Sequence, residues 1–144
     1  MNLLAPLYSF ADRLRFRRHG NVGRFGEDIA HRWLRRAGFT VVARNWRPPQ
    51  GGGELDLIAW DGAELVFIEV KTRASGAWNA PERDIDSEKM KALRRAARDY
   101  VRRAGAGEVE TRFDVIAIIG GSAGVSAGRT LEHHRDAFPF TLSL

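Results

Sequence analysis

The sequence predicts an α/β fold in which helices flank a mixed β-sheet, with the element order α-β-β-β-α-β. Two segments place apolar residues at helical spacing, and the short apolar runs between and after them are typical of strands. Helices on both sides of a sheet are the expected packing for this order. The chain has 144 residues, 44% of them hydrophobic, so one domain of this size can bury its own core.

The distribution of charge points to a polyanionic partner. The formal net charge is +5, but residues 1–47 carry +7, residues 48–82 carry −4 and residues 83–104 carry +4. An acidic centre between basic flanks is typical of a site that holds a metal while its rim attracts phosphate. Arginine outnumbers lysine by 20 to 3, for which codon bias is the alternative explanation. The absence of cysteine excludes disulfides, thiolate catalysis and cysteine-ligated zinc.

The N-terminal segment is expected to be an appended element. Residues 3–18 combine helical apolar spacing with a cluster of arginines at their end, which predicts an amphipathic helix packed on the domain or a partly ordered arm. Such a helix can also lie on a membrane surface or on DNA. We therefore divide the chain into a basic amphipathic N-terminal arm, residues 1–19, and a single domain, residues 20–144.

The first helix of the domain is expected over residues 23–37. Gly38 stands where a left-handed residue would end this helix. Its apolar stripe is predicted to contain Ala30, Trp33, Leu34 and Ala37. Residues 39–43 then have the composition of a strand.

Two further strands, residues 55–60 and 63–70, are joined by Asp61-Gly62, a strong hairpin signal. A loop over residues 72–83 precedes a helix that Asp86 or Ser87 caps. The remaining segments are a buried strand, a flexible loop and a short edge strand, at residues 113–119, 120–128 and 130–134.

The hairpin makes a geometric argument possible. A two-residue turn pairs Trp60 with Ala63, and alternation with period two then sets the face of every side chain. One face is predicted to carry Glu54, Asp56, Phe67, Glu69 and Lys71. The core face is predicted to carry Leu55, Leu57, Val66, Ile68 and Val70. Asp56 and Glu69 are then diagonal neighbours, roughly 7–8 Å apart at the backbone.

Carboxylates crowded on one sheet face repel each other unless positive charge lies among them. Oxygen ligands without His or Cys suit Mg²⁺ or Mn²⁺ better than zinc. Lys71 shares the face and can orient an attacking water or help to deprotonate it. The alternative is an ordinary sheet surface with solvated charges.

Two segments around these residues resemble the PD-(D/E)XK nuclease signature. They read GELDLI at residues 53–58 and VFIEVKTR at residues 66–73, with Leu55 where the superfamily name has proline. More narrowly, the chain is similar to the YraN-like family of small bacterial predicted endonucleases, which is related to archaeal Holliday-junction resolvases. The motifs shared with this family include GRFGE at residues 23–27, NWR at 45–47 and RFDV at 112–115.

The resemblance implies a restriction-endonuclease-like fold and a nuclease-like domain over residues 20–144. It also implies metal ligation by Asp56 and Glu69, Lys71 as the catalytic lysine and Glu27 as an auxiliary acid. The expected activity is Mg²⁺- or Mn²⁺-dependent hydrolysis of phosphodiester bonds in nucleic acid, with DNA as the favoured substrate. Whether the substrate is branched, nicked, single-stranded or RNA stays open. Glu54 would hold a second cation or support Lys71, and we favour support.

Several other polar residues have a structural and a functional interpretation. Arg24, Arg73 and Lys89 are expected to contact phosphate, although a solvated surface also explains them. Glu27 ends a core-facing helical row and needs a partner, either a metal-bound water or Lys71 or an arginine. Asp114 lies within an apolar strand and is expected to be a satisfied structural acid. His133 and His134 are adjacent, so in a strand they point oppositely and cannot share a metal.

Two rival functions remain open at this stage. One is a nucleic-acid-binding protein that keeps the fold without turnover, and the other is a peripheral membrane protein anchored by residues 3–18. No apolar run reaches the roughly 18 residues of a transmembrane helix, and the N-terminus is not a convincing signal peptide. We therefore expect a cytoplasmic protein without integral membrane association. Symmetric cleavage of a junction would require two sites and hence a homodimer, but the oligomeric state stays open.

Overall fold

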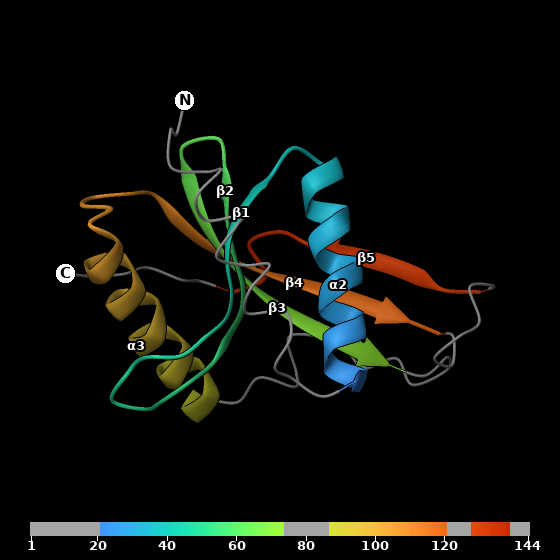
Figure 1. The fold of residues 1–144 in the computed structure, drawn as a ribbon, viewed down its shortest axis with the longest axis horizontal. Coiled ribbons are helices and arrows are strands. Elements are labelled where there is room, and N and C mark those ends of the chain that lie inside the picture. Colours follow the sequence, from blue (N-terminus) through green and yellow to red (C-terminus); the bar gives the residue numbers. More distant parts are fainter. Residues whose placement is uncertain (1–20, 74–86, 121–127, 139–144) are drawn as a thin grey trace.

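A five-stranded sheet organises the computed structural model, which describes residues 21–73, 87–120 and 128–138 (Figure 1). Its elements are helix α2 (Asn21–Arg36), strands β1 (Thr40–Trp46), β2 (Leu55–Asp61) and β3 (Glu64–Arg73), helix α3 (Ser87–Ala104), and strands β4 (Thr111–Ile119) and β5 (Thr130–His134). The described order is therefore α-β-β-β-α-β-β, and the expected edge strand is confirmed. The predicted arm lies outside the described residues and stays a prediction.

The sheet is mixed because one of its connections is a crossover. The strand order is β1-β2-β3-β4-β5, and every neighbouring pair is antiparallel except β3 and β4, which are parallel. Parallel neighbours need a long connection, and here it contains α3. The predicted α/β class with helices flanking a mixed sheet is confirmed, and the arrangement is consistent with the restriction-endonuclease-like fold that the motifs imply.

Two apolar clusters, one on each face of the sheet, form the core. Alternate residues of β3 divide between them: Phe67 packs with Leu93 of α3, whereas Ile68 packs with Leu34 of α2. The expected helical stripe is only half correct. Ala30 and Leu34 are buried, whereas Trp33 is 43% exposed and Ala37 is also exposed. A residue adjacent to Leu34 is rotated by about 100° around the helix axis, which here turns the indole away from the sheet.

Gly38 follows the end of helix α2 and caps it, as the sequence predicted. Gly38 has a φ of 93°, and the amide of Phe39 donates to the carbonyl of Leu34 at 2.9 Å. This bond closes the last turn of the helix, as the predicted left-handed cap requires. The strand that follows runs farther than expected, from Thr40 to Trp46 instead of ending at residue 43.

The predicted hairpin register is wrong by two residues. Trp60 pairs with Leu65 and Asp61 with Glu64, so the turn residues are Gly62 and Ala63. A distant residue explains the difference: Arg112 of β4 binds the carboxylates of Asp61 and Glu64, each at 2.9 Å. A shift of two residues keeps each side chain of a regular strand on its face but gives it a new partner.

Candidate active site

The candidate site forms where β2 separates from β3. The last described pair between these strands is Leu57 with Ile68, and the new register, if it continued, would bring Asp56 opposite Glu69. Instead, the amide of Val70 donates to Oδ2 of Asp56 at 2.8 Å. The side chain of Asp56 thus takes the place of a backbone hydrogen-bond acceptor at the end of the β2–β3 pairing, and it satisfies the Val70 amide.

The regular alternation predicted for β2 fails at this point. Leu55 packs in the cluster that faces α3, whereas Leu57 packs in the cluster that faces α2. The expectation that both leucines face one core is therefore wrong. The strand nevertheless keeps one register with β1 here, with Leu57 opposite Arg44 and Leu55 opposite Trp46, while the Asp56 carboxylate accepts from the Val70 amide.

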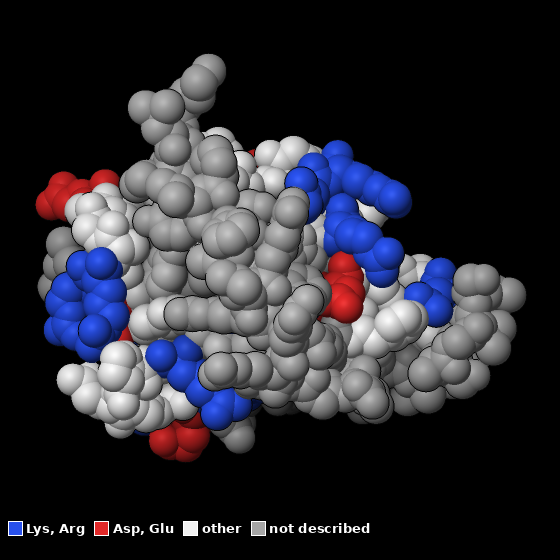
Figure 2. Space-filling model, in the orientation of Figure 1, with Lys and Arg blue, Asp and Glu red and all other residues white. Residues whose placement is uncertain are grey.

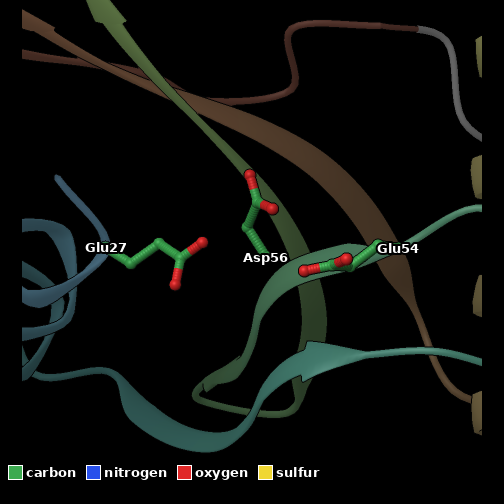
Figure 3. A group of neighbouring side chains, drawn as sticks. All are labelled: Glu27, Glu54 and Asp56. Carbon is green, nitrogen blue, oxygen red and sulfur yellow. The ribbon is translucent and has the colours of Figure 1, made fainter. Parts of the chain in front are cut away.

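Three carboxylates meet at this position. Carboxylate oxygens of Glu27, Glu54 and Asp56 all lie within 4.8 Å of one another. Figure 3 shows the side chains of Glu27, from α2, and Glu54, which immediately precedes β2, pointing toward Asp56 from either side. Residues that are far apart in the sequence therefore contribute to one group.

Two glycines let the surrounding helices approach closely enough to form this group. A Cβ atom at Gly26 would lie 3.0 Å from Oγ1 of Thr72, a tight contact, so glycine favours the close approach of α2 to β3. A Cβ atom at Gly53 would lie 3.0 Å from the backbone of Ala92 in α3. Each glycine immediately precedes a site acid, which links close backbone packing to the placement of Glu27 and Glu54.

Strand β1 holds Glu27 in place. Nδ2 of Asn45 donates to Oε2 of Glu27 at 2.8 Å, and Arg44 lies 3.5 Å from the same oxygen and 2.8 Å from Asp28. Asn45 has a φ of 49°, a left-handed conformation that costs energy for a residue with a side chain. Among the described contacts, an arginine and an amide are therefore the partners that Glu27 was expected to need.

Glu54 also has a partner, Arg47, which immediately follows β1. Nε of Arg47 donates to Oε2 of Glu54 at 2.6 Å. We favoured support of Lys71 as the role of Glu54, but its described contact is with Arg47 instead. The segment Arg44–Arg47 thus positions both auxiliary acids.

Glu69 lies between two lysines. Its Oε1 is 2.7 Å from Nζ of Lys89, on α3, and 3.4 Å from Nζ of Lys71, and only 6% of the residue is exposed. We expected Lys89 to contact phosphate, and its place beside Glu69 was not predicted. A sequence signal exists in retrospect: the chain has three lysines among 23 basic residues, and two of them are here.

The environment shifts the ionisation of the site. Burial, followed by the charge of Glu69, raises the pKa of Asp56 well above its ordinary value, although the Val70 amide opposes this. Burial and the neighbouring Lys89 lower the pKa of Lys71, against the attraction of Glu69. For Lys89, burial acts to lower the pKa, but the contact with Glu69 outweighs it and the pKa is raised. The Asp56 shift thus comes first from burial and second from the neighbouring acid Glu69.

The structure separates a second group of polar residues from this site. Asp114 is fully buried and binds Arg112 at 2.9 Å, His133 at 2.8 Å and the amide of Asp136 at 2.9 Å. Its predicted role as a satisfied structural acid is confirmed. His134 binds Glu132 instead, so the two histidines do point to different partners. Arg24 and Arg73 lie on α2 and β3, but their side chains are outside the described part.

Basic side chains lie on both helices that flank the site. Figure 2 shows Lys and Arg on the α2 side and on the α3 side of the molecule. The exposed arginines include Arg32, Arg35 and Arg36 of α2 and Arg95, Arg98 and Arg102 of α3. None of the helices in the described residues combines the length and apolar character needed to span a membrane.

Comparison with known proteins gives a consistent family match. Residues 26–118 match the model of "Uncharacterised protein family UPF0102". A UPF0102 protein of Solibacter usitatus is 50% identical over 94% of this chain and 100% of its own length. UPF0102 proteins of Beutenbergia cavernae and Porphyromonas gingivalis are 44% and 40% identical, over 79% and 86% of this chain and 92% and 88% of their own lengths.

Proposed function

This chain belongs to the uncharacterised protein family UPF0102, and we propose that it is a Mg²⁺-dependent nuclease that hydrolyses phosphodiester bonds of nucleic acid, with DNA as the substrate. The family description names no activity, so the proposal rests on the site. The observation that carries it is the meeting of Asp56 with Glu27 and Glu54, together with the contact of Lys71 with Glu69 at 3.4 Å. This is the residue set that the PD-(D/E)XK resemblance implies for phosphodiester hydrolysis.

The donor set fits a hard divalent cation. Three carboxylates offer oxygen atoms within 4.8 Å of one another, with no nitrogen or sulfur ligand among them. The raised pKa of Asp56 is compatible with the same assignment, because burial and the charge of Glu69 both disfavour the charged carboxylate and a bound cation would offset both effects. Asp56 belongs to this group and would hold Mg²⁺ or Mn²⁺. Glu69, which lies outside the group of three, would be the second ligand that the resemblance implies, with Glu27 as an auxiliary acid. When bound, the cation would polarise the phosphate and stabilise the charge of the transition state.

The other residues would prepare the reactants. Nζ of Lys71 would hold the attacking water or a phosphate oxygen, and its lowered pKa makes a proton on this nitrogen easier to share. Asn45 and Arg44 fix the carboxylate of Glu27, so that it is oriented before substrate arrives. Arg47 does the same for Glu54. The arginines exposed on α2 and α3 would bind the backbone phosphates on either side.

The test is cleavage of linear, flapped and four-way DNA substrates with Mg²⁺ or Mn²⁺, with EDTA as the blank. The critical variant is Asp56→Asn, since the asparagine oxygen can still accept from the Val70 amide while the charge is lost. We expect cleavage to fall by at least about 10²-fold. Glu132→Gln is the matched control, because Glu132 binds His134 on the edge strand. Cleavage by Asp56→Asn at the wild-type rate would refute the assignment.

A nucleic-acid-binding protein without turnover is the second candidate. The contacts of Glu69 with two lysines favour it, because they neutralise this acid without any cation. In that case the wild type would bind the substrates in EDTA but cleave none of them with either metal. Binding measurements on the same substrates therefore distinguish the two functions.

A further inference from the structure

The two lysines at Glu69 lie at different distances from its carboxylate, and the proposed chemistry gives Lys89, the nearer one, no role there. Glu69 is almost completely removed from water, and a buried carboxylate needs a compensating charge. Lys89 supplies the shorter contact, 2.7 Å against 3.4 Å for Lys71. Lys89 is therefore the main counter-charge of Glu69 among the described contacts.

The two lysines differ in how easily they can leave. The side chain of Lys89 is 39% exposed, and it reaches the site from α3. The side chain of Lys71 is 20% exposed and is fixed two residues from Glu69 on the same strand. The Lys89 ammonium can move into solvent when a bound cation takes over the compensation of Glu69, whereas Lys71 has less access to water. Lys89 is thus the lysine that can exchange.

The position of Lys89 in its helix is consistent with a role at Glu69. It is the third residue of α3, where the positive end of the helix dipole disfavours a cation. Lys91 lies in the same turn but is 62% exposed and pairs with Glu88. Local helix energetics therefore do not explain a lysine at residue 89, and the contact with Glu69 does.

We propose that Lys89 is a positioning residue that neutralises Glu69 in the cation-free protein and yields Glu69 to the divalent cation when the site is loaded. The released ammonium, which stays at the rim of the site, then contacts a phosphate of the nucleic acid. This inference rests on the proposed metal-dependent function and adds an exchange step to it. The lysine and the cation compete for Glu69, so each weakens the binding of the other there.

The first test is calorimetric titration of Mn²⁺ into the full-length wild type and Lys89→Met. Methionine keeps the length of the side chain and removes the charge that competes with the cation. We expect Lys89→Met to bind Mn²⁺ about tenfold more tightly, the effect of removing part of one nearby positive charge. The matched control is Lys91→Met, which has the same net charge but does not contact Glu69, and it should bind like the wild type.

Equal Mn²⁺ affinity in the wild type and Lys89→Met would overturn the exchange, and so would weaker binding by the variant. Failure of the proposed function would look different: neither the wild type nor any lysine variant would bind Mn²⁺, and no substrate would be cleaved. Tighter Mn²⁺ binding together with weaker DNA binding by loaded Lys89→Met is the expected pattern. Tighter DNA binding by the loaded variant would refute the phosphate contact.

The second test uses the wild type and so does not depend on the folding of a variant. Reductive methylation with formaldehyde, read by mass spectrometry, reports how accessible each lysine is, and the chain has only three. Lys89 should become several-fold more reactive when EDTA is replaced by saturating Mg²⁺, whereas Lys91 should not change. Unchanged or lower reactivity of Lys89 would refute the release.

Discussion

Asp56→Asn should make the cation-free protein more stable while it removes cleavage. The wild-type carboxylate is held among other acids and has a raised pKa, so its charge opposes folding. Asparagine has nearly the same shape and keeps an oxygen that can accept from the Val70 amide. Its amide group can also donate to a neighbouring carboxylate, which aspartate in its charged form cannot do.

The structure gives the size of the effect. At an effective dielectric constant of about 20, two unit charges separated by the 4.8 Å limit of the acid group repel by about 3.5 kcal/mol. The contacts of Glu27 with Arg44 and of Glu54 with Arg47 cancel much of this repulsion. We therefore expect the free energy of unfolding to rise by about 1–2 kcal/mol. For a chain of this size, the Tm should rise by about 3–8 °C.

The measurement is thermal unfolding in EDTA and in excess Mg²⁺ across a pH series. The folded protein holds the Asp56 proton more tightly than the unfolded chain, whose value is near 3.8. The charge therefore costs stability only above that pH, and the cost grows until the pH passes the raised folded value. The advantage of Asp56→Asn should accordingly vanish at acidic pH and be largest at neutral pH in EDTA.

Mg²⁺ provides the internal control. Binding to the folded state alone raises the Tm of the wild type and should not raise that of Asp56→Asn. A variant that is less stable than the wild type at neutral pH in EDTA would refute the electrostatic reasoning. Equal stabilisation of both proteins by Mg²⁺ would show that Asp56 is not a ligand.

Three further outcomes follow from other parts of the structure. Asp114→Asn should cost about 1–3 kcal/mol in urea unfolding, because Arg112 keeps Asp61 and Glu64 but the bonds to the buried Asp114 carboxylate are weakened. Burial acts to raise the pKa of Asp114, but the bonds from His133 and Arg112 outweigh it and the pKa is lowered. Wild-type stability should therefore fall as the pH drops through that lowered value. Asn45→Gly should keep the left-handed backbone conformation but lose the bond to Glu27, so cleavage should slow. Asn45→Ala should lose the same bond and also about 1 kcal/mol of folding stability, because alanine disfavours this conformation. An alanine variant as stable as the glycine variant would contradict backbone strain at residue 45. DNA affinity should fall roughly a hundredfold between 50 and 200 mM salt, and a flat dependence would mean that the arginines do not face nucleic acid.

Local patterns were sufficient for most of the fold. Apolar periodicity and glycine signals predicted both helices and the strands, because these depend on neighbours within a few residues. The hairpin register was not predictable in this way. The Asp61-Gly62 signal is local, but Arg112, 48 residues beyond Glu64, binds both acids and selects another pairing.

In the candidate site, too, local spacing predicted some features, whereas contacts between distant elements were not predictable. Spacing on one strand relates Glu69 to Lys71, and helical spacing gives Glu27 a core-facing position. The contact of Lys89 with Glu69 joins two elements that touch only after the crossover is built, so no periodicity reveals it. The break in alternation at Asp56 was also missed, because a regular strand was assumed where the ladder ends.

The bond between Asp56 and the Val70 amide has an evolutionary consequence. The side chain to which we assign the proposed chemistry also accepts from the backbone of β3, so its loss is not equivalent for every replacement. A descendant that abandoned catalysis would be free to change the charge but not the acceptor. We expect asparagine to be the common replacement in inactive lineages, and alanine to occur only where the end of β2 has been remodelled.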